Sequence, residues 1–355
     1  MKNSIPLLVI VLISYGCLNK KPNNKIVDVH FNRTYRLESQ PIKNTNIYCP
    51  NDHALIENYL LSVNLCHDTL INAIDLGKME SRYIIPKGKG PSEAIRLEYS
   101  GQIQKSGDIT KAGFFDRSRR NFLWIDPQKV IKGSYRDIEV EKIPEKIGIG
   151  EDLFRTDDGW AGTDLSGDGL LFLYNENTND IQWLDYEPKL SYRISDPRVK
   201  SHIYYSETKY NASLNKYICA LRYFPLVHVI NSRCQIEKTF RFKKKYDEPR
   251  IMREQGLPND ASPIYFWNVI STNSFIYILR ANISVKEYKN GSLQNTSLYV
   301  VDWDGKGQCK IDFDSPVANI EIDFHNKLIY GISPKDLENP LVRIQIPDHL
   351  KQYFK

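Results

Sequence analysis

The chain has 355 residues and a formal net charge of +5, and 41% of its residues are hydrophobic. This near balance of charge, without a basic surface interleaved with aromatic residues, excludes nucleic acid as the expected partner. The six cysteines include no CxxC pair, which excludes a zinc ribbon or a thioredoxin-like site. Most are expected to be buried thiols. A disulfide between Cys49 and Cys66 is an alternative for these two in an oxidising compartment.

The first sixteen residues have the pattern of a secretory signal. Lys2 precedes the apolar run Ile5–Ile13, which is too short for a hydrocarbon core that needs ~20 residues. Cys17 follows Gly16 and resembles the lipobox cysteine of bacterial lipoproteins, which carries a diacylglycerol. Ser14 stands where that family prefers Leu, so an ordinary signal peptidase site is the alternative. We expect three parts: a signal peptide over residues 1–16, a lipidated flexible tether over 17–25 and a folded body over 26–355.

The folded body is predicted to be all-β. Short alternating apolar runs are separated by Asn, Asp, Gly and Pro, and no long stretch with a period of 3.6 residues occurs. An apolar run that ends in Asp or Asn recurs five times, and a sixth copy lacks the terminal acid. The copies are Ile71–Asp75, Phe122–Asp126, Ile181–Asp185, Val227–Asn231, Leu298–Asp302 and Val342–Ile346.

The spacing of these copies predicts the architecture. Successive copies end 44 to 71 residues apart, which brackets the ~40 to 50 residues of a four-stranded propeller blade. Most copies follow another strand-like segment, so the two resemble strands B and C of a blade. We therefore predict a six-bladed β-propeller of four-stranded antiparallel blades, in preference to a sandwich or a β-solenoid. Because a ring needs closure, Ile26–Leu37 is expected to pair with the last blade.

Residues Gly88–Glu93 form a GxGPxE element. This element, the lipoprotein-like leader, the sixfold strand pattern and the segment Asn326–Gly331 together resemble the TolB-like six-bladed β-propeller lipoproteins of Bacteroidetes. The resemblance covers nearly the whole mature chain. It implies a lipid-anchored propeller at the outer membrane or cell surface, in a group whose biochemical role is largely unassigned.

Motifs for catalysis are missing from the sequence. It has no GxSxG elbow, no HExxH and no histidine cluster, so no metal and no cofactor are predicted and enzymatic activity is disfavoured. Gly88–Glu93 lacks the GK[ST] ending of a P-loop, and Asp164–Gly169 lacks the bidentate Glu of a calcium loop, so both are predicted to be turns. His228 is predicted to pack in the core. Acids that meet in the central channel remain an open route to catalysis.

The parity of the strands predicts one binding rim. In an up-and-down blade, the D-to-A crossover and the B-to-C connection emerge on the same face. Two long segments of these kinds, residues 245–263 and 282–295, should therefore project from one rim, where long loops meet partners. The predicted contact residues are Tyr246, Arg250, Arg253 and Tyr288, with Glu93 near the channel mouth.

Three functions follow from these patterns. The first is a non-enzymatic envelope lipoprotein, attached to the membrane through Cys17, that binds a protein or saccharide partner. The second is a hydrolase or lyase that acts on a glycan or peptide in the channel. The third is a structural subunit of an outer-membrane assembly. Several carboxylates and a His at the channel mouth would favour the enzyme, and a broad apolar patch on one face of the disc would favour the assembly.

Overall fold

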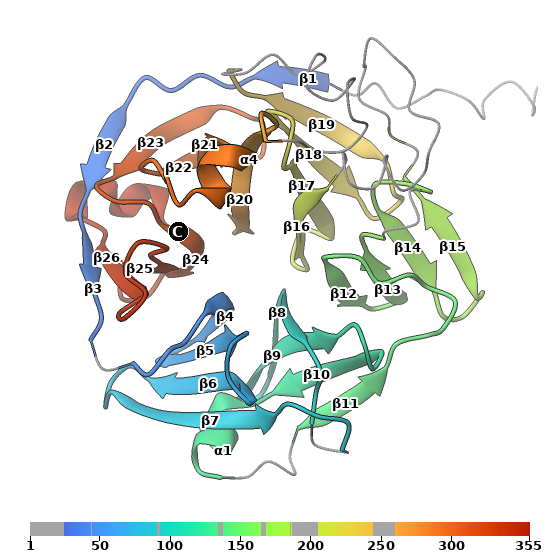
Figure 1. Cartoon of the computed structure of the whole chain (residues 1–355). Helices are drawn as coiled ribbons and strands as arrows, with labels where there is room; N and C mark the ends of the chain where they lie inside the picture. The colour runs from blue at the N-terminus through green and yellow to red at the C-terminus, as the bar shows by residue number, and fades with distance from the viewer. Residues whose placement is uncertain are drawn as a thin grey trace, which may run out of the picture.

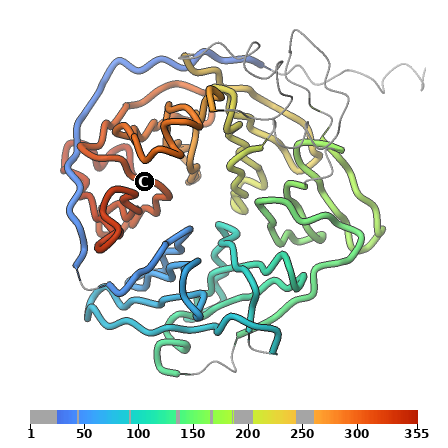
Figure 2. The backbone as a smooth tube through the Cα atoms, viewed as in Figure 1, coloured from blue at the N-terminus to red at the C-terminus, as the bar shows by residue number. Residues whose placement is uncertain are grey.

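Six antiparallel sheets surround a central axis and confirm the six-bladed propeller (Figure 1). Figure 2 follows the backbone from blue to red: the N-terminal segment runs along the perimeter, and the six blades then follow one another around the ring. In this computed structural model no helix of the described residues is long and apolar enough to span a membrane. The structure describes residues 25–43, 45–90, 93–133, 138–164, 168–184, 186, 205–243 and 260–355.

In the first three blades the first strand lies nearest the axis and the fourth lies at the perimeter (Figure 1). The strands of blade 1 are β4 (Pro50–Ile56), β5 (Tyr59–Asn64), β6 (Thr69–Asp75) and β7 (Glu80–Pro86). Those of blade 2 are β8 (Leu97–Ser106), β9 (Ile109–Asp116), β10 (Asn121–Ile125) and β11 (Glu139–Lys142). Those of blade 3 are β12 (Leu153–Thr156), β13 (Gly159–Gly162), β14 (Phe172–Asn175) and β15 (Asp180–Trp183).

The last three blades also use strands from the N-terminal part of the chain. The strands of blade 4 are β16 (Ser206–Asn211), β17 (Lys216–Leu221), β18 (Leu226–Asn231), β19 (Ile236–Arg241) and β1 (Lys25–Asp28). Those of blade 5 are β20 (Pro263–Ser271), β21 (Phe275–Ser284), β22 (Ser297–Asp302), β23 (Gly307–Phe313) and β2 (Thr34–Leu37). Those of blade 6 are β24 (Ala318–Asp323), β25 (Leu328–Ile332), β26 (Leu341–Gln345) and β3 (Ser39–Pro41). Short helical segments are α1 (Pro127–Ile131), α4 (Val285–Lys289) and the 3-10 helix η2 (Asp348–Tyr353).

The repeated terminal Asp or Asn caps the turn that follows strand C. The Asp75 carboxylate accepts hydrogen bonds from the backbone N–H groups of Gly77 and Lys78, at 2.9 and 3.1 Å. Asn231 and Asp302 bond the next turn in the same way, whereas Asp126 caps α1. Short polar side chains satisfy turn backbone groups well, which explains the recurrence of this residue type.

Blade 3 departs from the predicted strand order. The sequence predicts a C strand over Ile181–Asp185, but β15 in this segment is the D strand of its blade. The predicted B strand Leu170–Tyr174 overlaps β14, which is the C strand. The true B strand, β13, has the sequence GWAG and carries no apolar alternation. Gly159 is required there, because its φ is +150° and a Cβ would lie 2.2 Å from the Tyr174 carbonyl oxygen.

Hydrophobic side chains fill the spaces between neighbouring blades. Phe122 of blade 2, for example, meets the ring of Trp160 of blade 3 edge-on at 5.5 Å. His228 is a core residue, as predicted: its side chain is fully buried and its Nδ1 lies 2.9 Å from the Thr239 hydroxyl. Burial lowers the pKa of His228 to about 3, so the imidazole stays neutral.

The N-terminal part of the chain closes the ring, but with other residues than predicted. Strand β3 pairs antiparallel with β26 and completes the last blade. Ile26–Leu37 does not pair there: β1 and β2 run parallel to β19 and β23, as outer strands of blades 4 and 5. The alternating apolar residues of this segment pack on the core between those two blades instead. The chain therefore follows the perimeter past two blades before it reaches the sixth (Figure 1).

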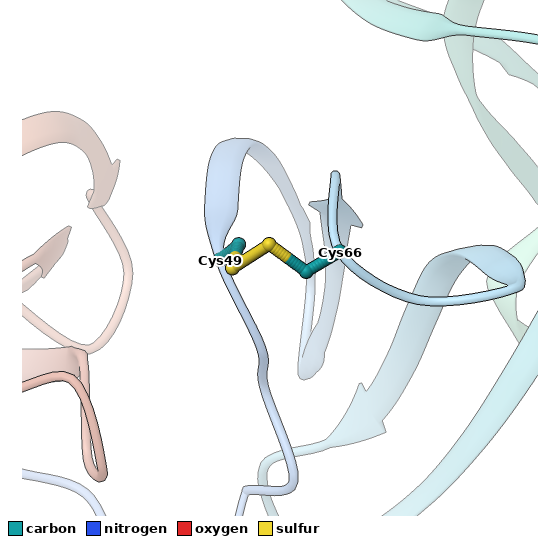
Figure 3. The surroundings of a disulfide bond; sticks show 2 residues. All are labelled: Cys49 and Cys66. Atoms are coloured by element: carbon teal, nitrogen blue, oxygen red, sulfur yellow. A yellow bond between two sulfur atoms is a disulfide. The ribbon is translucent and has the colours of Figure 1, made fainter.

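A disulfide joins Cys49 to Cys66, as the sequence allowed (Figure 3). Cys49 lies immediately before β4, and Cys66 lies in the connection between β5 and β6. The bond therefore ties the start of blade 1 to its B-to-C loop. Cys219, Cys234 and Cys309 are buried free thiols.

Ring closure can be tested with two N-terminal substitutions. Leu37 in β2 is 6% exposed, whereas Ile26 in β1 is 57% exposed. We expect Leu37→Ala to lower the free energy of unfolding by about 2–4 kcal/mol, because it leaves a cavity against blade 5. Ile26→Ala should change it by less than about 0.5 kcal/mol. Urea denaturation of both variants measures the difference, and equal effects would contradict docking of this segment.

Candidate functional site

The described parts of the two segments that were predicted to share one rim lie together in the structure. Their role in binding stays a prediction. The connection from β21 to β22 contains α4, and its backbone bonds the segment that leads into β20. Val285 N–H donates to the Ser262 carbonyl at 2.9 Å, and Lys286 N–H donates to the Asp260 carbonyl at 2.8 Å. The B-to-C connection and the D-to-A crossover of blade 5 therefore meet on one face.

The central channel opens on this rim as a pocket of about 280 Å³. All six blades contribute to its wall through their first strands or the residues beside them (Figure 1). Blades 1 to 3 contribute Asn51, Asp52, Arg96, Glu98, Tyr99, Glu151 and Asp152. Blades 4 to 6 contribute Tyr205, Glu207, Lys209, Trp267, Asn268, Ala318 and Asn319, and two B-to-C connections add Arg222 and Tyr288.

Lys209 of β16 is the central charge of the pocket. Burial alone would lower the pKa of Lys209, because it disfavours the charged ammonium. Four nearby carboxyl groups raise the pKa by more than burial lowers it, so it lies above its usual value. Its Nζ also lies 5.2 Å from the centre of the Tyr99 ring. The acids come from four different first strands or their flanks: Asp52, Asp152 and Glu207 line the pocket, and Glu321 of β24 lies outside its lining.

The same acids are poorly solvated. Burial raises the pKa of Glu207 to about 7 and that of Glu321 to about 8, against the attraction of Lys209. Burial also raises the pKa of Asp52, and it raises the pKa of Asp152 well above its usual value. Near neutral pH the pocket therefore holds protons that carboxyl groups in water would release.

A glycine of blade 2 makes room for the Lys209 side chain. Gly101 in β8 has a φ of +76°, and a Cβ at this position would lie 2.5 Å from Lys209 Cδ. Both the backbone conformation and the close approach require glycine. The position of the lysine is thus set by two blades.

Other acids of the wall have arginine partners. Glu98 pairs with Arg117 at 2.9 Å and with Arg96 at 3.1 Å, and Glu151 pairs with Arg117 at 3.3 Å. These pairs balance the charge of the wall around blades 2 and 3. Near blade 4, the Arg222 guanidinium lies 3.8 Å from Glu207.

Several polar atoms around the pocket have no hydrogen-bond partner within the described residues. Trp267 Nε1 and Asn268 Oδ1 belong to side chains that are each only 5% exposed, and Arg222 Nε is also buried. Behind the wall, burial lowers the pKa of His53 to about 4, against a backbone hydrogen bond with Tyr330 that raises it. An unpaired buried polar group costs about 1–3 kcal/mol. These atoms have almost no exposed surface, so a ligand would reach them only after side chains of the wall shift.

Of the predicted contact residues, the structure describes Tyr288 and Glu93, and Tyr288 lines the pocket. Tyr288 of α4 lies in the wall and its ring is 6.1 Å from that of Trp267. Glu93 lies in the crossover from β7 to β8, and its carboxylate accepts the Gly90 N–H at 2.5 Å within that turn. The structure does not bring Glu93 to the wall of this pocket. The remaining predicted residues, Cys17, Tyr246, Arg250 and Arg253, lie outside the described residues.

The charged residues of the first strands were not predicted from the sequence to form a site. Strand β16, SETKYN, mixes charged and polar residues and shows no apolar run. Asp52, Glu98 and Asp152 likewise lie at or beside the starts of first strands, which the repeated B and C pattern does not include. A useful signal would have been a charged residue about one strand length before each B segment.

The acids do not form a metal centre in the part of the chain that is described. No group of three His, Cys, Asp or Glu side chains there is close enough to hold one ion. They come instead from different blades and act on Lys209.

Comparison with known proteins supports the fold alone. No family model and no curated protein matches the chain. A member of the DUF4221 family from Bacteroides vulgatus is similar, with a TM-score of 0.58, 13% identity, and coverage of 86% of this chain and 95% of that one. A candidate exported protein from Bacteroides fragilis has a TM-score of 0.51, 11% identity, and coverage of 89% and 99%. Likeness at such identities establishes a shared propeller fold, while the TolB-like assignment stays a prediction.

The charged pocket predicts a pH-dependent stability. Because the pKa of Glu321 is about 8 in the folded state, the folded protein keeps a proton that the unfolded chain loses above its usual pKa of 4.5. Stability should therefore fall as pH rises from 5 to 8. Glu321→Gln should reduce that fall by about 1–3 kcal/mol.

Urea denaturation at both pH values measures this effect. Glu237→Gln is the matched control, because Glu237 pairs with Lys216 in blade 4 at 2.7 Å, outside the pocket wall. The control should follow the wild type. An equal pH dependence in the wild type and Glu321→Gln would contradict the buried carboxyl.

Proposed function

We propose that the protein is an exported, TolB-like envelope lipoprotein, anchored through Cys17 at the outer membrane or cell surface, whose central pocket binds a saccharide without transforming it. The observation that carries the binding role is the open pocket of about 280 Å³ at the end of the channel, which all six blades line with aromatic, carboxylate and amide side chains. Export is supported by the signal-like leader and by the name of the similar Bacteroides fragilis protein.

The chemistry of the wall supports a saccharide over a protein partner for this pocket. Trp267, Tyr205 and Tyr288 offer aromatic surfaces, and carboxylates and amides lie beside them. A sugar ring presents C–H faces to aromatic rings and hydroxyl groups to polar side chains. The volume of 280 Å³ equals roughly nine water molecules, which suits about one sugar unit. A protein partner would use the surrounding rim, as predicted for Tyr246, Arg250 and Arg253.

A hydrolase or lyase acting on a glycan is the second candidate. Glu207 and Glu321 have pKa values of about 7 and 8, which suit general acid–base catalysis near neutral pH, and His53 lies behind the same wall. We place this candidate second because these acids interact with Lys209 and the sequence carries no catalytic motif.

The test is a glycan array probed with the full chain, followed by calorimetry on each sugar that binds. Trp267→Phe replaces the indole by a smaller phenyl ring and so reduces the aromatic surface offered to a sugar, and we expect about a tenfold loss of affinity. Trp303→Phe is the control, since Trp303 Nε1 donates to the Thr272 carbonyl at 3.0 Å, away from the pocket.

Two outcomes would count against the proposal. Binding of no saccharide above background would remove the binding role, and full affinity in Trp267→Phe would place the site elsewhere. Release of new reducing ends from a bound glycan, abolished by Glu207→Gln, would favour the enzyme instead.

A further inference from the structure

The face opposite the central pocket carries two cavities of its own. The central pocket lies on the face of the B-to-C connections, since Arg222 and Tyr288 in its wall belong to such connections. The A-to-B and C-to-D turns emerge on the other face of the disc, because successive strands of a blade reverse direction. Residues of these turns surround one cavity of about 310 Å³ and another of about 430 Å³.

The first cavity is a groove between blades 3 and 4, which are neighbours in the ring (Figure 1). Its wall combines aromatic rings with exposed amide, hydroxyl and carboxylate groups. The exposed polar side chains are those of Asp157, Asp158, Thr178, Asp180, Asn215 and Ser232. Among the described residues of this wall there is no basic side chain.

The second cavity lies where the A-to-B turns of blades 4 and 5 approach β8 of blade 2. Apart from Lys355, the described residues of its wall are uncharged. The hydroxyl and amide groups belong largely to Gln102, Ser213, Ser271, Thr272, Asn273 and Ser274. This cavity therefore offers hydrogen bonds with little ionic charge.

Tyr210, near the end of β16, lines both cavities, so the two adjoin across its side chain. Its ring stacks on that of Tyr217, with 4.8 Å between the ring centres and an angle of 27° between the planes. Its hydroxyl donates to Asn215 Oδ1 at 3.1 Å. The half-buried ring is thus held in place as an aromatic surface between two polar cavities.

We propose that this face holds a second binding site, in which a non-acidic oligosaccharide lies across Tyr210 with one sugar unit in each cavity. The C–H face of a sugar packs on an aromatic ring, and its hydroxyl groups bond amides, hydroxyls and carboxylates. Each cavity is at least as large as the central pocket, whose volume suits about one sugar unit. The site is separate from that of the proposed function, because its described wall shares no residue with the central pocket.

The wall disfavours two other ligand classes. Asp157, Asp158 and Asp180 would repel the carboxylates of an acidic glycan. An extended peptide binds through pockets for its alternate side chains. Ile103 is the one exposed large hydrophobic side chain among the described residues of the two walls, so the groove offers such a peptide little apolar surface.

The test is calorimetry of the full chain with oligosaccharides of increasing length. Malto-, cello-, laminari- and manno-oligosaccharides supply neutral chains with different linkages, and oligogalacturonides supply the acidic comparison. In at least one neutral series, we expect the affinity to rise about tenfold or more from the monosaccharide to the trisaccharide. The acidic series should bind about tenfold more weakly than that neutral series.

Two variants locate the site. Tyr210→Leu keeps an apolar side chain against Tyr217 but removes the aromatic surface. Ser213→Arg places a bulky side chain in the second cavity from an exposed turn and leaves the core unchanged. Each should lower the affinity for the trisaccharide about tenfold. Tyr48→Ala, which removes an exposed ring outside both cavities, is the control and should keep the wild-type affinity.

Trp267→Phe separates this site from the central pocket and should leave the trisaccharide affinity unchanged. A loss in Trp267→Phe with full affinity in Tyr210→Leu and Ser213→Arg would overturn the inference and leave the proposed function in place. Affinity that does not rise with chain length, equal binding of the acidic series, or no binding of any series would also overturn it. Thermal unfolding checks each variant, and Ser213→Arg decides the outcome if Tyr210→Leu does not fold.

Discussion

The pairing of β3 with β26 is the interaction on which the rest of the structure depends. It joins the N-terminal part of the chain to the last blade, so the ring has no open seam there. Blade 6 carries Glu321, whose charge acts on Lys209 from across the channel. The pocket is formed by residues of all six first strands or their flanks. The pairing of β3 with β26 completes blade 6 and holds it in the ring, so the charges in the pocket depend on that contact at the perimeter. The guanidinium of Arg33, which donates to the Tyr353 hydroxyl at 2.7 Å, adds a second link between the two ends of the chain.

The fold separates what stabilises the molecule from what it offers to a ligand. Apolar clusters between neighbouring blades supply the stabilisation, as in the contact between Phe122 and Trp160. The channel end instead contains acids with raised pKa values and polar atoms without partners, which cost stability in the empty protein. Such groups persist where function requires them, at the expense of maximal stability. All six blades contribute side chains to the pocket wall, so the loss of stability is distributed over the ring.

The parts of the structure that follow local rules were predictable from the sequence. The C strands of blades 1, 2, 4 and 5 were found because an apolar run and a capping Asp or Asn are adjacent in the chain, as at Asp75 and Asp302. The C strand of blade 6 was found from its apolar run alone. Strand parity placed the two long connections of blade 5 on one face, and this step needs no side-chain detail. The pocket was not predictable in the same way, because Asp52 and Glu321 lie at opposite ends of the chain and meet only through ring closure. Blade 3 was misassigned since its B strand, with Gly159 at its start, has no apolar alternation.

Lys209 gives the pocket a fixed positive charge that does not titrate with its neighbours. Gly101 lets the side chain cross from blade 4 toward blade 2, and the surrounding acids hold its pKa above the usual value. As pH rises, Glu207 and then Glu321 lose their protons while the lysine stays charged. The pocket therefore becomes more negative around an unchanged ammonium. The same ammonium repels any second cation close to it, so the charge at the centre of the pocket is set by one residue whose position two blades fix.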